Sequence, residues 1–170
     1  VLSGIAVNSL GHCHPEVTRA IHRQSKKLVH ISNFYSSKPQ ADLAKKLVSK
    51  SGLHHAFFSN SGAEANETAY KLARKFASKN GRGGDIIAMN NCFHGRTLAN
   101  IATGKPKHQE GFDPIPAGFH KVPFNDLQAL KSKISQDTAA IILELIQGEG
   151  GIRIADKSYI ESVRELCNQE

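Results

Sequence analysis

Residues 138–146, TAAIILELI, form a nearly continuous apolar run that carries a single charged side chain, Glu144. A run of this length and composition is typical of a strand that is buried on both faces of a parallel sheet. Two shorter apolar segments, residues 55–59 (HAFFS) and 85–89 (DIIAM), have the length of further strands. The sequence therefore predicts a sheet whose strands are well separated along the chain.

Apolar residues at helical spacing occupy much of the chain around these strands. Helices are predicted over residues 15–30, 39–51 and 62–79, from Asn125 onward and from Ser158 onward. Pro15, Pro39 and Gly52 support the first two, since proline favours a first helical turn and glycine an end. Residues 90–123 are rich in Gly and Pro and are predicted to be a loop. Because helices alternate with strands, we expect an α/β fold with a mostly parallel sheet flanked by helices.

Two details of the helices follow from residue spacing. The helix over residues 62–79 is expected to face the core with Ala65, Ala69, Leu72 and Phe76. The pairs Asn125/Gln128 and Ser158/Glu161 have the spacing of capping boxes and are expected to begin the last two helices.

The composition narrows the class of protein. Hydrophobic residues make up 39% and charged residues 22% of the 170 residues, as in ordinary globular domains. No apolar run approaches the roughly 18 residues of a membrane-spanning helix. The net charge is +7, but the basic residues are scattered, so neither nucleic-acid binding nor membrane binding is expected.

Three cysteines, Cys13, Cys92 and Cys167, lie far apart and form no C-x-x-C pair. This usage is typical of free thiols in a reducing compartment, and we expect a cytoplasmic protein. His12 and His14 flank Cys13, but no second cluster completes a tetrahedral ligand set, so no metal is expected.

Residues 59–67, SNSGAEANE, lie between a predicted strand and the long helix. The small residues Gly62 and Ala63 allow an anion to approach the first N–H groups of the helix, which have no internal partner. The Ser61 hydroxyl adds a further donor. A simpler alternative is that Ser61 caps the helix with Glu64 as its capping-box partner. No nucleotide P-loop and no dinucleotide fingerprint is present, so a phosphate-bearing ligand other than a nucleotide remains open.

A second group of chemically useful residues, Phe93-His94-Gly95-Arg96, follows the segment at 85–89. Ligands of open α/β sheets bind at the carboxyl ends of the strands. An aromatic face can stack on a planar heterocycle, and the arginine fork can hold a carboxylate through two hydrogen bonds. Taken alone, a phenylalanine at this position is more often a core or lid residue, and the arginine is more often a surface cation.

Four segments, in this order, resemble those of the class III (fold type I) pyridoxal-phosphate aminotransferases. They are residues 4–17 (GIAVNSLGHCHPEV), 59–67, 93–97 (FHGRT) and 146–151 (IQGEGG). The resemblance covers essentially the whole chain and is closest to the acetylornithine branch, to which Asn66 and the run at 148–151 point. A leucine at position 145, where the family usually has proline, is a departure that removes no functional group.

The resemblance implies that pyridoxal 5′-phosphate is the cofactor. Ser61, Gly62 and Ala63 would then hold its phosphate, and Phe93 would pack on its ring. Arg96 would bind the α-carboxylate of the amino substrate.

Glu149 would pair with a second arginine that lies beyond Glu170, so that one pocket accepts two unlike side chains. Glu144 and Tyr35 are further candidates for the substrate pocket. No catalytic residue is assigned in the chain, because the Schiff-base lysine and the acidic partner of the ring nitrogen are also expected beyond Glu170.

The resemblance also predicts the domain organisation. Residues 1–33 would belong to a small domain, and residues 34–170 to an incomplete cofactor-binding large domain. Since an apolar stretch is under way at Val1 and helical spacing reaches Glu170, we expect a piece of a longer chain that is inactive by itself.

The expected activity is transfer of the δ-amino group of N2-acetylornithine to 2-oxoglutarate in arginine biosynthesis, by a homodimer. Ornithine and succinylornithine aminotransferases are alternatives within the family, and diaminopimelate substrates also remain open. From other classes, a non-catalytic binding module on the same fold and a basic nucleic-acid-binding domain stay open.

Overall fold

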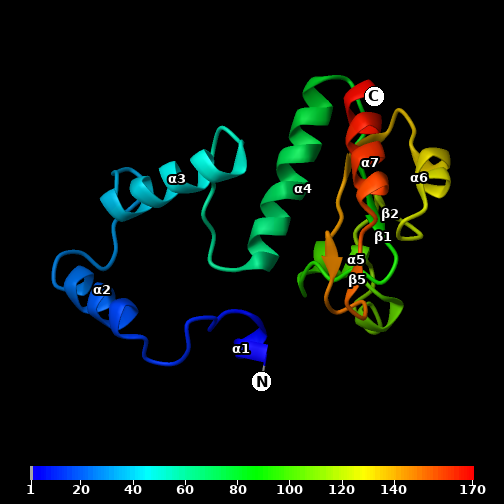
Figure 1. Cartoon of the computed structure of the whole chain (residues 1–170). Coiled ribbons are helices and arrows are strands. Elements are labelled where there is room, and N and C mark those ends of the chain that lie inside the picture. The colour runs from blue at the N-terminus through cyan, green and yellow to red at the C-terminus, as the bar shows by residue number, and fades with distance from the viewer. Residues whose placement is uncertain (1) are drawn as a thin grey trace. The chain divides into compact units, whose positions relative to one another are not determined.

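The central element of the fold is β1 (Asp85–Met89), which lies between two parallel strands in a computed structural model that describes residues 2–170 (Figure 1). Its neighbours are β2 (Phe119–Val122) and β3 (Thr138–Ile141), in the order β2-β1-β3. A separate antiparallel pair consists of β4 (Ile146–Gln147) and β5 (Arg153–Ile154). The expectation of an α/β fold with a mostly parallel sheet is confirmed.

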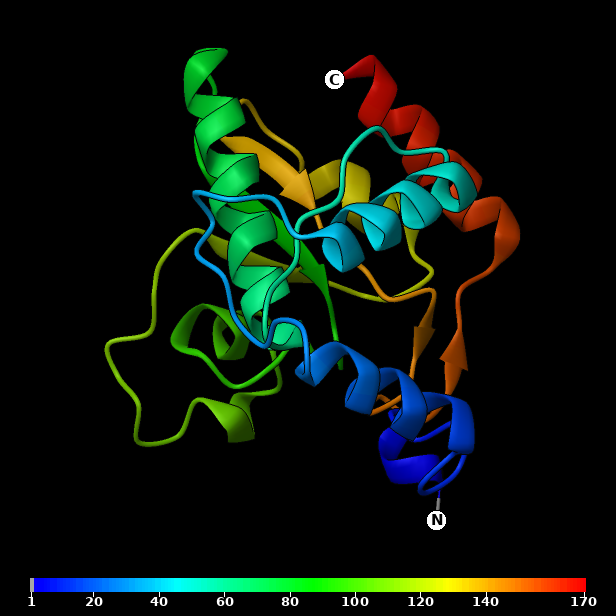
Figure 2. The same cartoon turned by 90° about the vertical axis from the view of Figure 1, so that its left-hand side faces the viewer.

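Helices cover both faces of this sheet (Figure 2). They are α4 (Gly62–Lys79), the short α5 (Leu98–Thr103), α6 (Leu127–Lys133) and α7 (Lys157–Gln169), with a 3-10 turn, η1, at Pro106–His108. On one face, Ile87 and Met89 of β1 pack with Leu130 of α6 and with Tyr159 and Val163 of α7. Side chains alternate along a strand, so the remaining buried residues of β1 face α4 and α5.

The chain divides into two compact units, the first ending at Ala56 and the second spanning Phe57–Glu170. The first unit contains α1 (Leu2–Ile5), α2 (Pro15–Ser25) and α3 (Lys38–Ser51), and neither α2 nor α3 has a buried residue. Gly52 ends α3 in the left-handed conformation, as its position predicts. The predicted boundary between residues 33 and 34 stays a prediction.

Several predicted bounds are wrong. Residues 55–59 form no strand, and the predicted strand at 138–146 is divided into β3 and β4. The first predicted helix ends at Ser25 rather than His30. The predicted loop over residues 90–123 contains α5, η1 and β2.

Both predicted capping boxes are also wrong. Asp126 caps α6 by accepting a hydrogen bond from the Ala129 N–H group at 2.9 Å, and Asp156 is the N-cap residue of α7. Asn125 has a positive φ of 63° and instead binds the segment before α7, since its side-chain Oδ1 accepts from the Asp156 N–H group.

The face of α4 that meets the sheet differs from the predicted one. Leu72 and Phe76 are 69% and 68% exposed, whereas Tyr70 and Ala77 are buried. Leu72 and Phe76 are therefore not the residues that face the core. The helix meets the sheet through Tyr70, whose ring packs edge to face against Phe119 of β2.

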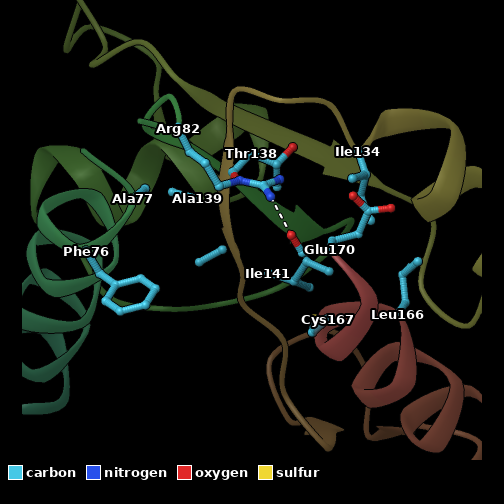
Figure 3. Close-up of a pocket in the computed structure, with 11 residues that line it drawn as sticks. Phe76, Ala77, Arg82, Ile134, Thr138, Ala139, Ile141, Leu166, Cys167 and Glu170 are labelled. Carbon is cyan, nitrogen blue, oxygen red and sulfur yellow. Dashed lines mark hydrogen bonds between the residues drawn. The ribbon is translucent and has the colours of Figure 1, made fainter. Parts of the chain in front are cut away.

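A cavity of about 180 Å³ lies beside β3 (Figure 3). It is lined by the last turns of α4, the whole of β3, the end of α7, Ile134 and Arg82. The guanidinium of Arg82 donates to the carbonyl oxygens of Ser135, Thr138 and Glu170 at 3.3, 3.2 and 2.6 Å. None of the predicted site residues lines this cavity, so it is not the candidate site.

Across the described part of the chain, no helix combines the length and the apolar character that a membrane crossing needs.

Candidate functional site

The first turn of α4 presents free backbone donors. Ser61 is the N-cap, and its Oγ accepts from the Glu64 N–H group at 3.2 Å, while the Glu64 carboxylate accepts from the Asn60 N–H group at 2.7 Å. Half of the capping box that the sequence offered as the simpler alternative is therefore present, since the Glu64 side chain binds Asn60 rather than the N–H group of Ser61. It leaves the N–H groups of Gly62 and Ala63 without partners among residues 2–170. A Cβ on Gly62 would meet nothing within 4 Å, so the space beside Gly62 is open.

This geometry fits an anion. The 18-residue helix adds partial positive charge at its N-terminus, and the hydroxyl of Ser61 can still donate. Capping and anion binding thus coexist at this turn, because they use different N–H groups.

The loop over residues 93–97 packs directly on the first turns of α4. The Asn66 side-chain amide donates to the His94 carbonyl at 2.6 Å. Gly95 has a φ of +126°, and a Cβ built on it would lie 2.8 Å from the Ala63 Cβ. Only glycine permits this approach without displacement. The structure therefore brings the predicted ring loop and the predicted phosphate turn together.

Phe93, at the start of this loop, is half-buried. Its ring meets His108 edge to face, with ring centroids 6.1 Å apart, and the Arg96 guanidinium carbon lies 5.5 Å from the Phe93 ring centroid. Burial, together with the charges of Arg96 and Lys105, lowers the pKa of His108. Arg96 is exposed and pairs with no carboxylate of the described residues, so its fork is free for an incoming one.

Glu144 follows β3 and reaches the ring loop. Its Oε2 accepts from the Phe93 N–H group at 3.1 Å. Burial raises the pKa of the Glu144 carboxyl, and the hydrogen bond from Phe93 and the charge of Lys105 offset part of that rise. Glu144 thus contacts the backbone of the predicted ring-stacking residue, and its predicted contact with substrate stays a prediction.

Glu149 lies in a turn that is attached to the loop after β1. Its side chain is exposed, and its carbonyl accepts from the Lys105 Nζ at 3.0 Å. The fully buried Gln147 donates from Nε2 to the Asn90 carbonyl at 2.9 Å, and a Cβ on Gly150 would lie 2.8 Å from the Asn91 oxygen. These contacts hold the Glu149 turn at the carboxyl ends of the strands.

Tyr35 belongs to the unit that ends at Ala56, and its side chain is 70% exposed. Its predicted part in the substrate pocket stays a prediction.

Sequence reasoning missed several residues that hold this site. His94 and Asn100 are buried, and Gln147 is 0% exposed, yet each leaves a buried polar atom without a partner among the described residues. Asn100 lies on α5, inside a segment predicted to be a loop, so no helical pattern drew attention to it. The available signal was an asparagine among the apolar residues of the segment LANIAT, which is typical of a buried amide with a structural role.

Glu144 offers a test of the ring-loop contact through stability. Because folding raises its pKa, protonation of Glu144 favours the folded state below the ordinary pKa of about 4.5. This contribution is lost as the pH rises through the folded-state pKa. In the full-length protein we expect Glu144→Gln to raise the thermal midpoint relative to wild type at pH 8 and to leave it nearly unchanged at pH 4.

Glu144→Ala is the comparison that isolates the hydrogen bond. It removes the acceptor that Gln retains, so it is expected to be about 1 kcal/mol less stable than Glu144→Gln at both pH values. Glu165→Gln, on an exposed part of α7, controls for the loss of a charge. Equal stability of the Gln and Ala variants would show that the Phe93 contact contributes nothing.

Comparison with known proteins gives consistent matches. Residues 1–170 match the model of the protein family described as aminotransferase class-III. An acetylornithine aminotransferase of Methanocaldococcus jannaschii is 58% identical, over 99% of this chain and 43% of that protein. The solved N-acetylornithine aminotransferase of Stenotrophomonas maltophilia K279a has a TM-score of 0.81 at 40% identity, over 99% of this chain and 42% of its own.

A further solved structure is the ornithine aminotransferase of Toxoplasma gondii, crystallised with partial occupancy of PLP at its active site. Its TM-score is 0.93 at 30% identity, over 99% of this chain and 41% of its own. The chain therefore spans about two fifths of the length of these relatives.

Proposed function

The chain belongs to the class-III aminotransferase family, and from that premise we propose that its protein is a pyridoxal-phosphate-dependent transaminase. The proposed reaction moves the δ-amino group of N2-acetylornithine to 2-oxoglutarate, which gives the semialdehyde and glutamate, as a step of arginine biosynthesis. When bound, the cofactor supplies the aldehyde that receives the amino group and the ring that accepts electrons.

The observation that carries this proposal is the contact between the start of α4 and the ring loop. Free N–H groups at Gly62 and Ala63 suit the phosphate. Phe93 precedes by two residues the Gly95 that approaches Ala63, and its backbone N–H group is held by Glu144. An anion site beside an aromatic side chain and a free guanidinium matches a cofactor with a phosphate and a planar ring, and a substrate with a carboxylate.

In this proposal the chain's own residues bind and orient. Ser61, Gly62 and Ala63 hold the phosphate, Phe93 packs on the ring, and Arg96 takes the α-carboxylate of the amino substrate. The backbone of Glu149 is held by Lys105, and its carboxylate is exposed. The carboxylate is therefore available to the second arginine, which is proposed to lie after Glu170. The lysine and the ring-nitrogen acid are proposed to lie after Glu170.

Ornithine is the second candidate amino donor. The M. jannaschii relative, 58% identical, is named for acetylornithine, but the T. gondii ornithine enzyme has a TM-score of 0.93. Succinylornithine remains a third donor. A free α-amino group distinguishes ornithine from the two acylated donors, so a comparison of the three donors addresses this choice.

The test uses the protein expressed from its complete coding sequence with added pyridoxal phosphate. Glutamate formation from 2-oxoglutarate is measured with N2-acetylornithine, ornithine and N2-succinylornithine as donors. We expect kcat/KM to be highest for N2-acetylornithine, by about tenfold or more. A substrate whose polar groups all find hydrogen-bond partners in the site is favoured by at least that factor over one that leaves a group unpaired. No glutamate from any donor would overturn the transaminase proposal, and a preference for ornithine would replace the substrate.

The remaining expectations belong to the same proposal. We propose a cytoplasmic homodimer in which residues 1–33 belong to a small domain and residues 34–170 to the cofactor-binding large domain. Sedimentation of the full-length protein with and without the cofactor tests the dimer, and a monomer at micromolar concentration would contradict it.

A further inference from the structure

Four polar side chains connect α4 to the ring loop, and we call them the α4–loop clamp: Asn66, Glu67, Thr97 and Asn100. The Asn66 amide donates to the His94 carbonyl at 2.6 Å, and the Thr97 hydroxyl donates to the Glu67 carboxylate. The Asn100 side-chain amide donates to the Ala63 carbonyl at 3.1 Å and to the Thr97 Oγ1 at 2.7 Å. Each of these bonds ends on the first two turns of α4 or on residues 94–97.

Asn100 occupies the centre of the clamp. Its side chain is 0% exposed, and its Nδ2 would lie 2.8 Å from a Cβ on Gly95. The same nitrogen therefore contacts the first turn of α4, the N-cap of α5 and the backbone of the ring loop. Because buried amides are expensive to leave unpaired, this arrangement resists any sliding of the loop along α4.

The clamp lies between the two proposed cofactor subsites. Ala63, whose carbonyl Asn100 holds, also carries one of the free N–H groups at the start of α4. His94, whose carbonyl Asn66 holds, directly follows Phe93. The clamp therefore fixes the separation of the phosphate subsite from the ring subsite, although none of its side chains needs to touch the cofactor.

We infer that Asn66, Glu67, Thr97 and Asn100 are positioning residues that set the distance between the phosphate and ring subsites; this rests on the proposed function. Pyridoxal phosphate has a rigid ring joined to its phosphate by a single methylene arm. Its two ends bind together at full strength only when the subsites are held at one separation. Loosening the clamp is expected to lower the affinity for the whole cofactor. The affinity of each subsite for its own fragment, ring or phosphate, stays the same.

The experiment compares three probes on the full-length protein: pyridoxine 5′-phosphate, pyridoxine and inorganic phosphate. None of them carries an aldehyde, so lysine chemistry does not interfere. For Thr97→Val, which keeps the side-chain shape and removes the hydroxyl, we expect the Kd of pyridoxine 5′-phosphate to rise about tenfold. The Kd values of pyridoxine and phosphate, measured by competition, are expected to change less than about twofold.

Two variants serve as controls. Thr97→Ser keeps the hydroxyl and is expected to bind pyridoxine 5′-phosphate about as tightly as wild type. Thr68→Val removes a hydroxyl whose bond, to the Glu64 carbonyl, stays within α4, so all three Kd values are expected to remain unchanged. Glu67→Met removes the acceptor oxygens and keeps the side-chain length. It tests the same pair from the other side, should Thr97→Val fail to fold, and is expected to give the same pattern.

The outcomes separate the two proposals. If wild type does not bind pyridoxine 5′-phosphate, the proposed cofactor site itself is wrong. If wild type binds but Thr97→Val and Glu67→Met bind equally well, the positioning role is wrong and the cofactor site stands. An equal loss for all three probes would also overturn positioning, since it indicates a general structural role.

Discussion

Arg96→Gln is expected to lower kcat/KM for the proposed donor, N2-acetylornithine, by about 100-fold, with cofactor binding unchanged. The guanidinium is exposed, has no carboxylate partner among residues 2–170, and stands 5.5 Å from the Phe93 ring centroid. A bidentate ion pair is lost when the fork is replaced by an amide, and such losses cost about 2–4 kcal/mol. The loss is expected for the amino donor, because its α-carboxylate is the group that Arg96 is proposed to bind.

Steady-state kinetics with each substrate varied in turn measures this effect. Arg96→Lys keeps the charge without the fork and is expected to retain more activity than Arg96→Gln. Arg164→Gln, on an exposed part of α7, controls for a change in net charge. If Arg96→Gln keeps wild-type kinetics, Arg96 is the surface cation that its sequence position also allows.

Gly95→Ala is expected to weaken cofactor binding by more than about 100-fold and to lower the thermal midpoint of the full-length protein. The added Cβ would lie 2.8 Å from both the Ala63 Cβ and the Asn100 Nδ2, at a φ of +126°. Left-handed strain costs about 1–2 kcal/mol, and overpacking adds about 1–3 kcal/mol. The loop can relieve the clash only by moving off α4, which separates the two subsites.

Gly111→Ala is the matched control. Its φ is +80°, but a Cβ there meets nothing within 4 Å, so it has backbone strain without the clash. The double variant Ala63→Gly/Gly95→Ala removes one of the colliding methyl groups and is expected to recover part of the binding. Wild-type affinity of Gly95→Ala for pyridoxal phosphate would contradict the close approach described above.

The elements that the sequence predicted best are those set by local signals. Gly62–Lys79 and Asp85–Met89 have the predicted bounds, because a capped helix start and an apolar run bounded by glycines determine them. The edge strand β2 was missed because FHKV is short and contains two polar residues, and an edge strand needs less apolar character than a central one.

The predicted core face of α4 was wrong because tertiary contacts, rather than apolar spacing, determine which side of the helix is buried. Apolar spacing selected Leu72 and Phe76, whereas the buried side of the helix carries Tyr70 and Ala77. The clamp residues Asn66 and Glu67 bind residues of the ring loop through polar contacts. Periodicity measures hydrophobicity alone, and it does not register a polar contact between distant segments. A common site for the ring loop and the phosphate turn was expected instead from the family resemblance and from the edge rule for parallel sheets. The structure shows Gly95 of that loop close to Ala63.

The strand order has a consequence for how the site comes into being during synthesis. β1 leaves the ribosome before either of its partners, and its pairing with β2 must wait for residue 119 and with β3 for residue 138. Parallel pairing across such loops has a high contact order and is slow. The bond from Phe93 to Glu144 spans 51 residues, so the ring loop takes its final position only after β3 has docked.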